Sequence, residues 1–169
     1  MKLFIKAVIV LITVLFVLIV AIHIYAYLLL FGNRYSTTKW TPKIQTFVES
    51  ELNIPLPQTV PVQYFFFDKF QDYISELLIS VPYSDVPKYI PKGIEEAAPF
   101  DSKTEFLGYI NSKNIKYSLK TKLKEFEFYK RYSGRIPDKK LHCEVLVLSQ
   151  QDFETLPSSA PVDVLIYFF

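Results

Sequence analysis

His142 and Cys143 are the side chains best suited to nucleophilic chemistry in the part of the chain that follows the apolar N-terminus, and they are neighbours. A cysteine nucleophile needs a base within hydrogen-bond reach. Residues 141–149 predict a β-strand, in which neighbouring side chains point to opposite faces, so we expect one of the pair to be buried and the other exposed. A serine triad would depend on the same histidine, and the sequence contains no G-x-S-x-G motif.

The sequence predicts no cofactor and no metal ion. One cysteine excludes a multi-cysteine metal site and an intrachain disulfide, and four isolated glycines cannot form a phosphate-binding loop. Asp68 and Asp72 flank a predicted turn and could offer oxygen ligands to Ca²⁺, but they lack EF-hand spacing, and solvated turn residues are the simpler interpretation. We therefore predict that the protein is not an enzyme.

Charge is distributed unevenly along the chain. Ten basic and three acidic residues lie between Lys113 and Lys140, whereas ten acidic and four basic residues lie between Glu49 and Glu105. The two regions could simply face each other or solvate separate surfaces; alternatively, the basic region contacts a partner. A net charge of +2 is too small to indicate nucleic acid. The predicted binding residues are Lys120, Lys122, Lys124, Arg131, Tyr132 and Arg135.

Residues 7–31 form an uncharged apolar run. A bilayer core of ~30 Å needs about 20 apolar residues, so this run predicts one transmembrane helix that is too long for the core of a signal peptide. Tyr25, Tyr27 and Phe31 resemble an interfacial aromatic belt. The expected arrangement is a single pass through a bacterial inner membrane, with a cytoplasmic tail at 1–6, a linker at 32–41 and a periplasmic domain at 42–169.

The domain at 42–169 predicts an α+β fold with an antiparallel sheet of five or six strands and two or three short helices. Thr41 and Pro42 are typical of a helix start, and Ser102 with Glu105 has the spacing of a capping box, so helices are expected at 42–52 and 103–111. Regular alternation with outward lysines predicts a strand at 116–124. The other expected strands are 62–67, 73–81, 126–132, 141–149 and 162–169.

Several short motifs occur in the first half of the domain: Leu56-Pro57, Tyr64-Phe65, Phe70-Gln71-Asp72-Tyr73, and Val81-Pro82 followed by Asp85. Together they resemble a pattern in small, uncharacterised, membrane- or lipid-anchored bacterial extracytoplasmic proteins. The resemblance covers about 30 residues and implies an outward-facing domain containing a β-hairpin. It implies no catalytic residues. The chain differs from the lipid-anchored members because it has no lipobox cysteine.

These features favour a protein-binding domain. The concrete form that we expect is an immunity protein that neutralises a secreted toxin in the periplasm while anchored by its N-terminal helix. The alternative is an accessory protein of envelope assembly or lipid handling, with a basic surface that faces the membrane.

Overall fold

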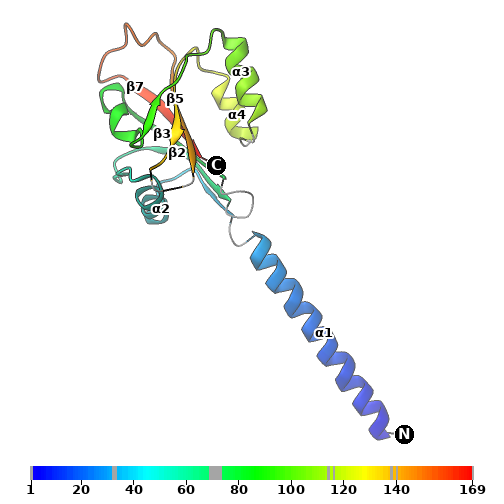
Figure 1. The fold of residues 1–169 in the computed structure, drawn as a ribbon. Coiled ribbons are helices and arrows are strands. Elements are labelled where there is room, and N and C mark those ends of the chain that lie inside the picture. Colours follow the sequence, from blue (N-terminus) through cyan, green and yellow to red (C-terminus); the bar gives the residue numbers. More distant parts are fainter. Residues whose placement is uncertain are drawn as a thin grey trace. The chain divides into compact units, whose positions relative to one another are not determined.

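The chain forms two compact units, Met1–Arg34 and Tyr35–Phe169, seen here in a computed structural model (Figure 1). The predicted tail at 1–6 and linker at 32–41 stay predictions. The structure describes residues 2–31, 34–68, 74–113, 115, 117–137, 139 and 141–168. Residues 70–73 of the resemblance pattern, with Asp72, and Phe169 at the predicted end of the last strand lie outside these ranges.

The first unit contains one helix, α1 (Lys2–Phe31). Over the residues that the structure describes, no helix is both long and apolar enough to cross a membrane. The transmembrane helix predicted at 7–31, and the single-pass inner-membrane localisation with a periplasmic domain, are therefore corrected.

The second unit is built on a seven-stranded sheet with the strand order β1-β2-β3-β7-β6-β5-β4. All strand pairs from β2 to β4 along this order are antiparallel. The C-terminal strand β7 therefore lies at the centre of the sheet, between β3 and β6. The strands are β1 (Arg34–Thr37), β2 (Val62–Asp68), β3 (Ile74–Pro82), β4 (Ile94–Glu96), β5 (Phe128–Arg135), β6 (His142–Ser149) and β7 (Pro161–Phe168).

Helices cover both faces of the sheet (Figure 1). On one face, α2 (Pro42–Leu52) buries Ile44, Val48 and Leu52 against alternate residues of the central strands. We call this the α2 face. On the other, the α3–α4 face, α3 (Lys103–Ser112) and α4 (Tyr117–Leu123) bury four apolar side chains against the remaining alternate residues. Strands buried on both sides read as nearly continuous apolar runs, as β6 and β7 do.

The helix starts follow from local hydrogen bonds. The Thr41 hydroxyl accepts a bond from the backbone N–H of Ile44 at 3.3 Å, and Pro42 occupies the first helical position. The Ser102 hydroxyl accepts from the N–H of Glu105 at 3.2 Å, while the Glu105 carboxylate accepts from the N–H of Asp101. Both caps satisfy backbone donors that the first turn leaves free. The helices predicted from these two signals are confirmed.

The predicted counts of five or six strands and two or three short helices are wrong. The described residues form seven strands and five helices, the fifth being the 3₁₀ helix η1 (Tyr83–Tyr89). Where a strand was predicted at 116–124, the structure has the helix α4 at Tyr117–Leu123, because Leu119 and Leu123 are buried together at i, i+4 spacing while Thr121 is exposed. The two strands that were not predicted, β1 and β4, have four and three residues, which are too few to show the alternation of polar and apolar residues that identifies a strand.

Phe106 provides a test of the α3–α4 face. Its side chain is fully buried and stacks on Tyr129 with ring centroids 4.1 Å apart. Phe106→Ala should lower the free energy of unfolding by about 3–5 kcal/mol, measured by urea unfolding of the full chain with the fluorescence of Trp40. Gly108→Ala in the same helix is the control, because a Cβ there meets nothing within 4 Å and should cost nothing. A loss below about 1 kcal/mol for Phe106→Ala would contradict this packing.

Cys143 provides a second test, because it is fully buried on the α2 face and His142 is not. Burial raises the pKa of the Cys143 thiol to about 12, so almost no thiolate exists at pH 8. We expect a maleimide to label the native chain far more slowly than the urea-unfolded chain, as followed by intact mass. Ser36→Cys, at an exposed position, should add a fast-reacting thiol. Equally fast native labelling of Cys143 would place it outside the core.

Candidate functional site

The six predicted binding residues fall into two groups. Lys120 and Lys122 are on α4 and Lys124 follows it; Arg131, Tyr132 and Arg135 are on β5. The lysine amines of Lys120 and Lys122 have local partners: the carbonyl of Asn111 at 3.1 Å and the Asp163 carboxylate at 3.7 Å. On β5, the strand register places Arg131 and Arg135 on the α3–α4 face and Tyr132 on the α2 face. The structure therefore does not bring the six residues into one patch.

Arg131 belongs to a buried polar cluster centred on Glu144 of β6, whose side chain is 4% exposed. One carboxylate oxygen of Glu144 accepts a hydrogen bond from the Arg131 guanidinium at 2.9 Å. The other lies 3.1 Å from the Lys113 amine and accepts a bond from the Tyr109 hydroxyl. His142 lies 3.9 Å from Glu144 and shares a 3.0 Å hydrogen bond with the Ser133 hydroxyl. Three elements, α3, β5 and β6, therefore meet at one carboxylate.

The Tyr109 ring organises the two cations of the cluster. The Lys113 amine and the Arg131 guanidinium carbon each lie 4.8 Å from its centroid, and Phe100 lies 5.6 Å from the guanidinium. These distances allow cation–π attraction in addition to the ion pairs. The Arg131 Nε is buried and has no hydrogen-bond partner within the described part of the chain.

Burial sets the protonation of this cluster. It raises the pKa of Glu144 to about 7, against the opposing pull of the two cations. Burial, with the neighbouring Arg131, lowers the pKa of Lys113. Burial, followed by the charges of Lys113, Arg135 and Arg131, lowers the pKa of His142, which is therefore neutral at pH 7. A buried carboxyl with a pKa near neutrality could act as a general acid or base, but Glu144 is enclosed by its donors.

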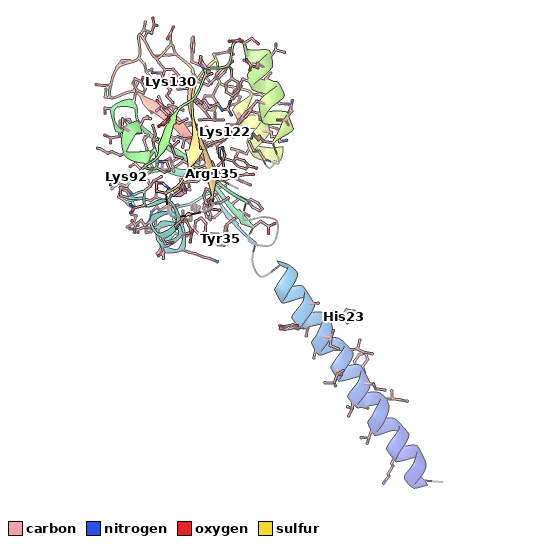
Figure 2. All side chains as sticks on the ribbon, in the orientation of Figure 1. His23, Tyr35, Lys92, Lys122, Lys130 and Arg135 are labelled. Carbon is pink, nitrogen blue, oxygen red and sulfur yellow. The ribbon has the colours of Figure 1, made fainter. Side chains whose placement is uncertain are left out.

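A groove with a volume of about 490 Å³ lies beside the cluster, along the outer edge of β5. It is lined by three residues of β5, by three residues at and after the end of β4 and by three residues that follow β6: Tyr129, Lys130, Arg131, Glu96, Ala97, Pro99, Asp152, Phe153 and Glu154. Lys130 donates a 2.8 Å hydrogen bond to the Tyr83 hydroxyl and lies 5.1 Å from the ring of Phe153. Figure 2 shows Lys130 and Arg135 near opposite ends of this strand. The groove combines aromatic side chains with side chains of both charges.

A second cavity, of about 430 Å³, is mostly apolar and lies between α2 and β2. Tyr35, Phe47, Phe65 and Phe67 line it, and the amine of Lys43 lies 4.3 Å from the Tyr35 ring centroid. Its lining contains no acid–base pair. Among the described residues no three His, Cys, Asp or Glu side chains are placed to hold a metal ion.

The sequence analysis missed Glu144, Tyr109 and the fully buried Glu76. A usable signal was present for the two glutamates. Each is the only charged residue in a strand that is otherwise mainly apolar, which is unusual because an unpartnered buried charge is costly. Tyr109 gave no such signal, since a tyrosine on an amphipathic helix is ordinary.

Comparison with protein-family models, curated proteins and solved structures finds no match. The resemblance to small extracytoplasmic proteins stays a prediction.

The raised pKa of Glu144 predicts a specific pH dependence. A glutamate in an unfolded chain has a pKa of about 4.3, so the native state holds this proton more tightly, and its contribution to stability falls as pH rises from about 4 to about 7. Relative to Glu144→Gln, the wild-type chain should lose about 2–3 kcal/mol of unfolding free energy over that range, measured by urea unfolding.

Glu127→Gln is the control, because that carboxylate is half exposed and forms a surface ion pair with Lys103. A relative gain in wild-type stability with rising pH would show that Arg131 and Lys113 outweigh burial at Glu144.

Proposed function

We propose that residues 35–169 form a protein-binding domain without catalytic turnover, which acts as an immunity protein by blocking a toxin in a stoichiometric complex. The observation that carries this proposal is the groove along β5. Tyr129, Arg131 and Phe153 line it, and Tyr and Arg are among the residue types that contribute most to protein–protein affinity. β5 is held by β6 through eight paired positions, so the groove rests on a rigid element.

The buried cluster favours binding over catalysis. The Glu144 carboxylate is within reach of Arg131, Lys113 and Tyr109, and its side chain is 4% exposed. A substrate would have to displace these groups before it could contact the carboxyl. The cluster instead fixes Arg131 beneath the groove, which gives a partner a preorganised surface and lowers the entropic cost of binding.

Lys120 and Lys124 have a complementary role in this proposal. They are four residues apart at α4 and its end, which places them on one side of the helix. Exposed charges around an interface mainly change the association rate, because they steer an oppositely charged partner. We assign these two lysines to the rim of the contact surface, with an acidic partner surface opposite them.

The test uses the full chain and the product of a toxin-like reading frame beside its own gene. We expect a complex of one copy of each protein by calorimetry, and rescue of growth when the two are produced together. Absence of both a complex and rescue with every neighbouring reading frame would overturn the proposal, as would turnover that Glu144→Gln abolishes in a chain that still folds.

The rim assignment predicts a kinetic effect. Lys120→Glu with Lys124→Glu should slow association with that partner about tenfold at low salt, and the difference should shrink as salt rises, measured by stopped flow. Lys39→Glu with Lys92→Glu is the matched control, since it changes the net charge equally at exposed positions elsewhere. Lys122 is left intact because it lies 3.7 Å from Asp163. If both double variants slow association equally, the effect comes from net charge alone and the assignment of Lys120 and Lys124 to the contact surface is wrong.

A further inference from the structure

β4 covers only part of the outer edge of β5. Its three residues pair with Tyr132, Ser133 and Gly134, and one further hydrogen bond runs from the N–H of Ala97 to the carbonyl of Arg131 at 2.8 Å. β5 continues for three more residues, 128–130, beyond this bond. In an antiparallel sheet alternate residues direct their backbone groups to the same side, so Tyr129 presents its N–H and C=O toward this edge, as Arg131 and Ser133 do.

The chain leaves the edge after Ala97. Pro99 has no N–H to donate, and Phe100 packs on the α3–α4 face, with its ring centroid 5.6 Å from that of Tyr129 and 5.4 Å from that of Phe106. The segment that follows β4 therefore turns onto one face of the sheet and does not continue the pairing. The groove of about 490 Å³ occupies this place, beside Tyr129–Arg131.

The exposed side chains around the groove are mainly acidic. Glu96, Asp152 and Glu154 are all exposed, and Arg131, which also lines the groove, forms an ion pair with the buried Glu144. Lys130 offsets part of this charge, since it interacts with Glu96. Asp152 and Glu154 remain, and they are fixed by a turn in which the Asp152 carboxylate accepts from the N–H of Glu154 at 3.0 Å. A partner segment that carries basic side chains complements this rim.

We propose that the edge of β5 at Phe128–Lys130, beyond the bond between Ala97 and Arg131, binds an extended basic segment of a partner protein as an added strand, next to β4. The inference rests on the proposed function and specifies how the partner is held. Strand addition takes its affinity from main-chain hydrogen bonds and its specificity from side-chain pockets. Here Phe153 contacts an apolar side chain of the segment, while Asp152 and Glu154 contact its lysine or arginine side chains.

Three synthetic probes test this mode with the full chain. They are a nine-residue peptide of alternating lysine and valine, the same peptide with glutamate for lysine, and the lysine peptide with every second backbone nitrogen methylated. We expect the first to bind at least tenfold more tightly than the other two by fluorescence anisotropy. Amide exchange at Tyr129 should slow only when the first peptide is bound.

Variants of Asp152 and Glu154 separate the contribution of charge from that of strand pairing. Asp152→Asn with Glu154→Gln should weaken binding of the lysine peptide about tenfold at low salt, and asparagine keeps the carbonyl oxygen that accepts from residue 154 in the turn. Glu49→Gln with Glu125→Gln removes two exposed carboxylates elsewhere and should leave binding unchanged.

Equal affinity for the methylated and unmethylated peptides would overturn strand addition, and equal or tighter binding of the glutamate peptide would overturn the basic partner. Absence of binding at 1 mM peptide, on the order of the weakest specific affinities, would also overturn the proposal. The acidic side chains would then protect the edge from pairing. Pairing of two copies at this edge, detected by sedimentation, would replace the partner segment by a second chain. If the toxin complex forms equally well with the Asp152→Asn and Glu154→Gln variant, the proposed function stands and this inference fails. If the lysine peptide binds but no toxin complex forms, this inference stands and the proposed function fails.

Discussion

Burial of the central strands on both faces is the constraint on which the rest of this domain depends. β6 places Cys143, Val145 and Val147 on the α2 face and Leu146 and Leu148 on the α3–α4 face, and β7 alternates in the same way. Apolar burial on both sides of a sheet requires a layer of helices on each side. α2 supplies one layer, and α3 with α4 supplies the other. The positions of the groove and of the polar cluster follow from this arrangement, because both lie where the helical cover ends.

Arg131 joins the polar cluster to the groove. Its guanidinium reaches Glu144 on one side and lies against the rings of Tyr109 and Phe100, while the residue also lines the groove. A planar guanidinium can stack and form an ion pair at the same time, which a lysine ammonium does less well. The cluster therefore stabilises the α3–α4 layer and holds the edge strand at a fixed place.

The sequence was sufficient where the signal is local. Thr41 and Ser102 are caps whose hydrogen bonds involve residues three positions away, and their helices start where expected. It was insufficient at 116–124, where the apolar positions satisfy both a period of two and an i, i+4 spacing, and only the tertiary cover of the sheet decides between them. The pairing of Glu144 with Arg131 and Lys113 depends on strand order and helix placement, which no short window of sequence contains. The groove depends on where β4 stops, and three residues are too few to predict that.

The central position of β7 has a consequence for how the chain is made. β3 is complete once residue 82 has been synthesised, but its second neighbour begins only at residue 161. At about 5–20 residues per second the intervening segment takes on the order of 4–16 s, during which the β2–β3 hairpin exposes an open apolar edge. Such an edge can pair with another nascent chain. The central strand of the sheet is thus the last of the seven to be synthesised, and β3 and β6 cannot be joined through it before then.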